Sequence, residues 1–380
     1  MKKAISIIIL LGLLLTGLAG CSTPVSQPVS SPGTTQENGE ENTKGEIGVS
    51  LSADNAFNSD FLTEFKRLSE ESGFHIVAKS AGGDHKQQTN DILALIEAEV
   101  KIMVIDPVNI DELDQAIGEC DTAGIPVIDL MEPINEVTDM LISPDYIKMG
   151  AEAAKAAKAL LTNGDKAEGH VLMLQGSLDS FLMQMLHDGF TAALPESETL
   201  TQDGQYCDFD ETKAYNAVKE AVASGKAPSL IFAQSESMAK GAIKAIDEAK
   251  ASVKIVSIGA DEDIISAIQN KKISTAVYVS PKELAEKASL YVQKYLKDNN
   301  AAIPTYTGIE IGIAEEGNAS SLIPSGSKYA RLPNSEGNSD TQESEEPEST
   351  DTPENTDVPE SSQTPQSSET PQSSTSPAAT

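Results

Sequence analysis

Short apolar runs alternate with longer amphipathic stretches between residues 46 and 330, and this alternation restricts the fold more than any other feature of the chain. Most runs are continuous in Val, Ile and Leu, as in strands covered on both faces. The expected strands are Ile47–Leu51, His75–Lys79, Ile102–Ile105, Pro126–Asp129, Met140–Ile142, His170–Leu174, Leu230–Ala233, Lys254–Ile258 and Ser274–Val279. The expected helices are Phe61–Glu71, Asp84–Ala98, Tyr146–Leu161, Leu178–Leu194, Glu211–Ser224, Met238–Ala249, Ile264–Asn270 and Glu283–Leu296. The pattern predicts an α/β fold with mainly parallel sheets and right-handed crossovers.

The N-terminus has the anatomy of a secretory signal peptide. Two lysines precede the apolar stretch Ala4–Leu15, and Leu18–Cys21 reads Leu-Ala-Gly-Cys. A charged start, an apolar centre and a small-residue cleavage site are typical of secreted chains. The Cys after the cleavage site resembles the lipobox of bacterial lipoproteins, which implies removal of residues 1–20 and lipidation of Cys21. The alternative is a short membrane anchor with an incidental Cys, but a span needs about 20 apolar residues.

Two further segments lack the composition of a folded domain. Residues 21–45 hold no apolar pattern and are expected to be a flexible spacer. Residues 331–380 are rich in Ser, Thr, Pro, Glu and Gln, repeat TPQSS, and predict a disordered acidic tail. We expect a solvated extension; the alternative, contact with cell-wall polymer, would normally use aromatic or basic residues. The formal net charge of −32 excludes nucleic acid as a partner on electrostatic grounds.

The nucleophilic and metal-binding residue types show no catalytic spacing. Cys120 lies in a helical pattern and Cys207 near the end of a strand pattern, so two separate buried thiols are expected rather than a bridge, which an oxidising compartment would allow. None of the four histidines pairs with Cys, Asp or Glu at metal-ligand spacing. We therefore expect no enzyme, no catalytic residue, no metal and no cofactor.

Small or polar residues follow several predicted strands. Parallel sheets bind ligands outside the carboxyl ends of their strands, so these positions are candidates for ligand contact. They are Ser52 to Phe57, Asp106, Leu130 to Glu132, Gly176 to Asp179, Ser235-Glu236 and Asp261. The same residues are suited to capping the next helix, as expected for Ser235 and Asp261. The two roles are compatible because both occur at this rim.

Six segments carry a resemblance in order and spacing. They are IDPVN (Ile105–Asn109), AGIPVIDL (Ala123–Leu130), SPDYIKMG (Ser143–Gly150), MLQG (Met173–Gly176), FAQSESMAKGAIKAI (Phe232–Ile246) and VSIGAD (Val256–Asp261). Together they resemble type I periplasmic sugar-binding proteins, the ribose- and galactose-binding family of ABC importers. The resemblance implies two Rossmann-like lobes, 46–143 plus 280–308 and 144–279 plus 309–330, joined by a three-crossing hinge. It also implies that a ligand is held between the lobes.

The resemblance carries a binding pattern over only in part. Asn55 and Phe57 match a polar residue and a stacking aromatic, Asp106 a polar acceptor, Phe209 a second-lobe aromatic and Asp261 an acceptor. At other positions this chain departs from the family pattern. Asn58 occupies the place of a second aromatic residue, and Met131-Glu132 occupies the place of an Asp-Arg pair. Gln184 is found where the family has an arginine, and Ser235, followed by Glu236, is found where the family has an Asn.

These departures predict the character of the ligand. The expected site, with Ser52 added from the rim, is rich in acceptors, and Arg67 is the only arginine between residues 46 and 330. Such a site suits a neutral polyol or a cationic ligand and disfavours anions.

The sequence therefore predicts a lipid-anchored, extracytoplasmic and monomeric binding protein that delivers a sugar-like solute to an ABC permease. A sensory lipoprotein of the same fold, which signals to a membrane receptor, is the alternative. A transcription regulator of this fold would need a helix-turn-helix before residue 46, where the signal and spacer lie.

Overall fold

The computed structural model describes residues 46–178, 180–225, 227–299 and 301–333. The predicted signal peptide, Cys21, the spacer and the tail from residue 334 onward lie outside the described residues, as does Asp179. The folded unit ends at Arg331. Within the described residues, no helix is long and apolar enough to cross a membrane.

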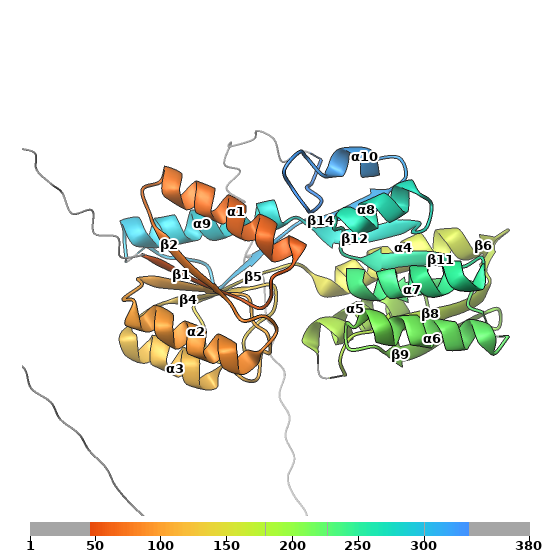
Figure 1. Ribbon diagram of the computed structural model, residues 1–380, viewed down its shortest axis with the longest axis horizontal. Coiled ribbons are helices and arrows are strands. Elements are labelled where there is room, and N and C mark those ends of the chain that lie inside the picture. The colour runs from red at the N-terminus through yellow and green to blue at the C-terminus, as the bar shows by residue number, and fades with distance from the viewer. Residues whose placement is uncertain (1–45, 179, 226, 300, 334–380) are drawn as a thin grey trace, which may run out of the picture. The chain divides into compact units, whose positions relative to one another are not determined.

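Two six-stranded sheets form the centres of two lobes (Figure 1). The sheet of the N-terminal lobe has the order β13-β5-β4-β3-β1-β2, and all of its pairs are parallel. Its strands are β1 (Ile47–Leu51), β2 (Ile76–Ser80), β3 (Ile102–Ile105), β4 (Val127–Leu130), β5 (Met140–Ser143) and β13 (Tyr306–Gly308). The helices of this lobe are α1 (Ala56–Glu71), α2 (His85–Glu97), α3 (Asp114–Ala123) and α9 (Pro281–Lys297).

The sheet of the C-terminal lobe has the order β14-β12-β11-β10-β8-β9 and is parallel except for β14 against β12. Its strands are β8 (Gly169–Gln175), β9 (Leu200–Tyr206), β10 (Leu230–Ala233), β11 (Lys254–Ile258), β12 (Thr275–Val279) and β14 (Ile311–Glu315). The helices are α4 (Tyr146–Leu161), α5 (Phe181–Ala193), α6 (Glu211–Ala223), α7 (Glu236–Ala249), α8 (Glu262–Gln269) and α10 (Ala319–Leu322), and β6 (Thr162–Asn163) and β7 (Lys166–Ala167) form a short hairpin.

The chain passes between the two sheets three times, after Ser143, after Val279 and after Gly308. Each passage leaves a strand of one sheet and enters an element of the other lobe. The predicted fold class, two α/β lobes with mainly parallel sheets, is confirmed.

Helices cover both faces of each sheet, which explains the continuous apolar strands. In the N-terminal lobe, α1 and α9 lie on one face and α2 and α3 on the other (Figure 1). Successive side chains of β3 point to opposite faces of the sheet. Ile102 and Val104 belong to the hydrophobic core on one face, and Met103 and Ile105 belong to the core on the other. All four side chains are fully buried.

The expected elements are present, and the structure adds edge strands and short helices that the pattern did not predict. β9 reads LTQDGQY and has five exposed residues, because one edge of the sheet is open to solvent. α1 begins at Ala56, five residues before the expected start, with Asn55 as its N-cap. Cys120 and Cys207 are both free and buried, so the expectation of two separate thiols is confirmed.

Candidate ligand-binding cleft

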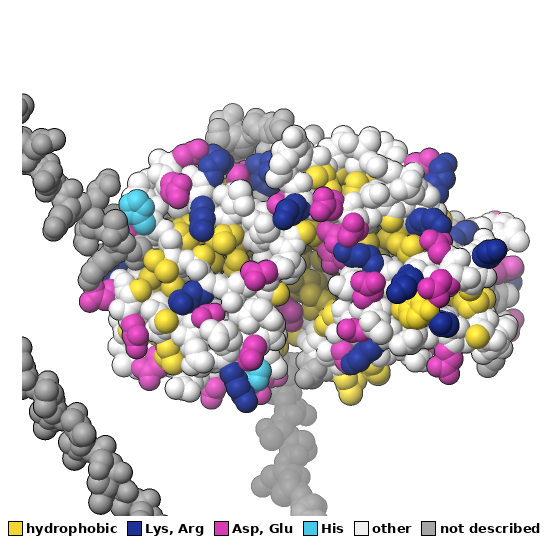
Figure 2. Space-filling view, viewed as in Figure 1, with side chains coloured by type: hydrophobic (Ala, Val, Ile, Leu, Met, Phe, Trp, Pro, Cys, Tyr) yellow, Lys and Arg dark blue, Asp and Glu magenta, His cyan; other side chains and the backbone are white. Residues whose placement is uncertain are grey.

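A cavity of about 270 Å³ lies between the carboxyl ends of the two sheets. Its walls come from both lobes, and Figure 2 shows a hollow between the lobes with apolar side chains inside it. The lining includes Ser52, Asn55, Phe57, Asn58, Asp106, Met131, Glu132, Tyr146, Phe209, Gln234, Ser235, Glu236, Gly259, Tyr278 and Tyr329. It combines three carboxyl groups with five aromatic rings, and no Lys, Arg or His is among the lining residues that the structure describes.

Asp106 is held in place by polar groups of the N-terminal lobe. Its Oδ2 accepts hydrogen bonds from the Ser52 backbone N–H at 3.2 Å, from the Ser52 hydroxyl, and from Asn58 Nδ2 at 2.9 Å. Asn58, which stands where the resemblance would place an aromatic, is buried and serves as a support for Asp106. Burial raises the pKa of Asp106, while the hydrogen bonds from Ser52 and Asn58 oppose this shift.

Glu132 lies at the end of β4, beside Asp106. Burial, with a smaller contribution from the nearby Asp106, raises the pKa of Glu132 to about 7, although the Leu182 N–H opposes this shift by donating to the carboxylate. The preceding residue, Met131, has φ 67°, a left-handed conformation that non-glycine residues seldom adopt. Its carbonyl accepts from the Tyr146 hydroxyl at 3.2 Å and from the Ser143 hydroxyl, which keeps this strained turn in place.

The aromatic wall depends on close approaches of the backbone. A Cβ on Gly176 would lie 2.0 Å from Cζ of Phe209, so only glycine leaves room for this ring. Phe209 itself has φ 57°. Gln234, which is 1% exposed, holds the same rim because its Oε1 accepts from the Gly176 N–H at 3.1 Å.

The C-terminal lobe presents Ser235 and Glu236 at the start of α7. Ser235 is the N-cap and accepts from the Met238 N–H at 3.3 Å, which confirms its expected capping role. Burial raises the pKa of Glu236, and its Oε1 accepts from the Tyr329 hydroxyl at 2.6 Å. Gly259 has φ +89°, and a Cβ there would lie 1.9 Å from Glu236 Oε1.

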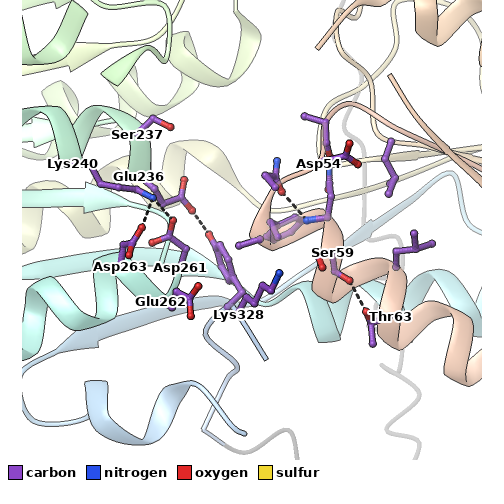
Figure 3. Close-up of a pocket in the computed structure, with 18 of the residues that line it drawn as sticks. Asp54, Ser59, Thr63, Glu236, Ser237, Lys240, Asp261, Glu262, Asp263 and Lys328 are labelled. Carbon is purple, nitrogen blue, oxygen red and sulfur yellow. Dashed lines mark hydrogen bonds and ion pairs between the residues drawn. The ribbon is translucent and has the colours of Figure 1, made fainter. Parts of the chain in front are cut away.

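Asp261 lies in a wider outer part of the cleft, about 780 Å³ in volume (Figure 3). Its Oδ1 caps α8 by accepting from the Ile264 N–H at 2.9 Å, and its Oδ2 accepts from Lys240 Nζ at 2.8 Å. The expected capping role is confirmed, and both oxygens already have a partner. Lys240 also pairs with Asp263 at 3.0 Å, and Lys66 and Lys328 line the same outer part.

The comparisons with known proteins agree with this geometry. Residues 47–300 match the model of the periplasmic binding protein domain. The chain belongs to the periplasmic binding protein family. A curated relative is the ribose import binding protein of Bacillus subtilis, 25% identical over 76% of this chain and 92% of the relative. The predicted resemblance to the type I sugar-binding branch is thereby confirmed.

Two solved structures share the fold of this periplasmic binding protein. An ABC transporter solute-binding protein from Mycobacterium smegmatis with bound glycerol has a TM-score of 0.68 and 23% identity, over 75% of this chain and 99% of its own. The fructose-binding periplasmic domain of a hybrid two-component system has a TM-score of 0.66 and 18% identity, over 73% of this chain and 92% of its own.

Most of the predicted site residues of this periplasmic binding protein meet at the inner cavity. They are Ser52, Asn55, Phe57, Asp106, Met131, Glu132, Phe209, Ser235 and Glu236. The structure does not bring Gln184 to them, because this exposed side chain donates to the Leu178 carbonyl at 3.3 Å. Asp261 lines the outer part instead.

Sequence reasoning missed several lining residues. Tyr146 and Gln234 lie inside segments that carry the resemblance, and Gln234 directly precedes the predicted site residue Ser235, so a signal was present in the sequence. Tyr278 lies within a predicted strand. Tyr329 lies beyond the matched stretch, and no motif marks it. Within the described residues, no group of three or more His, Cys, Asp or Glu is placed to hold a metal ion.

Proposed function

We propose that this periplasmic binding protein captures a small neutral or cationic polar solute, most simply a sugar or sugar-like polyol, and presents it to an ABC permease. The inner cavity carries the proposal: Asp106, Glu132 and Glu236 offer acceptors beside aromatic rings, and the described lining holds no basic group. Acceptors suit hydroxyl or ammonium donors, and rings suit the C–H face of a sugar. Glycerol and ribose, named for the similar proteins, are neutral and rich in hydroxyls.

Site contacts are part of the proposal. Phe57 and Phe209 approach the cavity from opposite lobes and would lie against an apolar face of the ligand. Asp106 and Glu132 would accept its hydrogen bonds. Closure of the two lobes would then bury these contacts and form the surface that the permease recognises.

A ligand screen tests the proposal. The full-length protein is heated with neutral sugars and polyols, amines and amino sugars, and with sugar acids and sugar phosphates. A ligand present at 100 times its Kd stabilises the folded state by about 2.7 kcal/mol, which raises the melting temperature. We expect stabilisation by neutral or amine compounds. Stabilisation by anionic compounds alone would refute the proposed ligand class.

A sensory role is the second candidate, because one neighbour in fold is the fructose-binding domain of a two-component system. Both roles use ligand-induced closure, so the partner distinguishes them. Capture of a permease by the ligand-bound protein supports import, and capture of a receptor kinase supports sensing.

We propose that Cys21 anchors the protein to the outer face of the membrane as a lipoprotein, and that the protein acts there as a monomer. Supporting this, Leu18–Cys21 follows a charged and apolar leader. We expect wild-type protein in the membrane fraction and Cys21→Ala protein in the soluble extracytoplasmic fraction or retained as precursor. Membrane-bound Cys21→Ala of mature length would contradict the lipid anchor; Cys120→Ala, which changes a buried thiol, is the control.

A further inference from the structure

The segment after α10 returns to the mouth of the cleft and attaches to the C-terminal lobe. Tyr329 forms an antiparallel bridge with Asp261, and the Ala330 N–H donates to the Ala260 carbonyl at 3.0 Å. The Glu262 N–H donates to the Lys328 carbonyl at 3.1 Å. In Figure 1 this loop lies between α8 and α1, and Figure 3 shows Lys328 facing the opposite lobe. The segment is therefore built into the rim where β11 ends.

Tyr329 forms part of the inner wall. Its side chain is 4% exposed, and its ring meets the ring of Phe57 edge to face, with 5.2 Å between centroids. Its hydroxyl accepts from the Ala260 N–H at 3.0 Å and donates to Glu236 at 2.6 Å. β11 is followed by Gly259 and Ala260, so the Tyr329 hydroxyl reaches the backbone at this end of the strand, and Gly259 and Tyr329 line the same cavity.

Asp60 joins the same segment to the N-terminal lobe. Asp60 lies on α1, one turn after Phe57. Its Oδ2 accepts from the Lys328 N–H at 2.9 Å, from the Tyr329 N–H at 3.0 Å and from the Ser327 hydroxyl. Separation of the lobes at this edge must break all three hydrogen bonds, because the donors and the acceptor belong to different lobes.

We propose that Ser327–Tyr329 is an interlobe clasp and that Tyr329 is a ligand-contacting residue that limits the size of the ligand. The clasp holds the α1 edge of the cleft closed through Asp60, and the Tyr329 ring forms, with Phe57, an aromatic corner for a single small ring. The ligand-contacting role rests on the proposed function, whereas the clasp rests only on the three hydrogen bonds to Asp60.

Hydrogen exchange of the ligand-free, full-length protein tests the clasp. The Lys328 and Tyr329 amides donate to Asp60, so Asp60→Ala is expected to raise their exchange rates about tenfold or more, since a lost protecting hydrogen bond leaves an amide open to solvent. Amides at the cleft ends of β10 and β11 are expected to exchange faster as well. Glu70→Ala removes an exposed carboxylate from the same helix and is expected to leave both sets of exchange rates unchanged. Unchanged rates at Lys328 and Tyr329 in Asp60→Ala, or faster rates there alone, would overturn the clasp.

Substitution of Tyr329 tests the ligand contact with the compound that most stabilises the wild type in a panel of glycerol, D-ribose, D-fructose and a disaccharide, maltose. Tyr329→Ala is expected to weaken binding at least tenfold and to improve maltose binding relative to the smaller compounds. Tyr329→Phe keeps the ring but leaves the buried Ala260 N–H and Glu236 without their partner, so a loss of about fivefold is expected. Unchanged affinity and size preference in Tyr329→Ala would overturn this role. If the wild type binds no panel compound, the ligand-contacting role fails with the proposed function, and hydrogen exchange still decides the clasp.

Discussion

The ligand-free protein is expected to be more stable at pH 5 than at pH 8, by an amount on the order of several kcal/mol, because its interior holds carboxyl groups that resist ionisation. Asp129 is one of two such groups with a pKa raised to about 7. It is 1% exposed on β4, and its Oδ1 has no hydrogen-bond partner among the described residues. Burial raises the pKa of Asp129 from 3.8 to about 7, against the hydrogen bonds from Thr138 and Ile134.

The sign follows from the two states. The unfolded chain releases the Asp129 proton near pH 4, whereas the folded protein keeps it until about pH 7. The folded state therefore binds more protons in this window, and the stabilising contribution is lost as the pH rises through it. Of the pKa shift of Asp129, about 2 units lie between pH 5 and the folded pKa of about 7, which corresponds to about 3 kcal/mol at 1.36 kcal/mol per unit. Glu132, whose pKa is raised to about 7, adds to the slope in the same direction.

Chemical denaturation of the full-length protein at pH 5, 6, 7 and 8 measures this slope. Asp129→Asn is expected to reduce the slope and leave the part due to Glu132, because the amide has no proton to lose, while the matched exposed change Asp121→Asn on α3 leaves the slope unchanged. Equal stability of the wild type at pH 5 and pH 8 would show that Asp129 and Glu132 are ionised at little cost in the folded protein.

Gly189→Ala is expected to destabilise the protein by about 3 kcal/mol, because it drives two helices apart. A Cβ on Gly189 of α5 would lie 2.0 Å from the carbonyl oxygen of Ile147 on α4, and a Cβ on Gly150 of α4 would lie 2.2 Å from the carbonyl oxygen of Leu186 on α5. Backbone atoms cannot move aside as a flexible side chain can. The next residue, Phe190, stacks on Phe232 of β10 with centroids 4.3 Å apart, so displacement of α5 also disturbs the core.

Thermal denaturation with Gly118→Ala as the control isolates this effect. Gly118 lies in α3, and a Cβ there would meet nothing within 4 Å. Alanine is favoured over glycine inside a helix, so Gly118→Ala is expected to stabilise the protein by up to about 1 kcal/mol. The two substitutions are chemically identical, and their opposite signs would show that the α4–α5 contact, rather than the loss of glycine, is responsible. A Gly189→Ala protein as stable as the wild type would contradict this close contact.

The central strands were predictable because both faces of each sheet are covered, which forces continuous apolar runs such as Ile102–Ile105. The edge strands β9 and β13 were not, because an open edge tolerates polar residues and glycine. The start of α1 was missed because Asn55, Asn58 and Asp60 are polar residues that make hydrogen bonds at the cleft, so residues 55–60 do not show the apolar stripe of a helix.

The site was predictable where the chain places polar residues directly after a strand. Asp106 and Glu236 follow this rule, since parallel strands end at one edge. Asp261 also follows this rule. Its ion pair with Lys240 could not be predicted, because Lys240 lies one turn after Glu236 on α7 and reaches Asp261 only once the helices are packed. The role of Tyr329 could not be predicted from the sequence, because it depends on the return of a segment distant in sequence to Asp60 and Phe57.

Titration calorimetry with the most stabilising neutral or amine compound tests the central claim, that the inner cavity between the lobes binds the ligand. We predict one site per chain, and a loss of affinity of at least about fivefold in Phe57→Ala and in Asp106→Asn, since each removes about 1 kcal/mol or more of contact. Tyr206→Ala, which changes an exposed ring at the sheet edge, is expected to bind as the wild type does. Wild-type affinity in both Phe57→Ala and Asp106→Asn would place the ligand elsewhere and contradict the account.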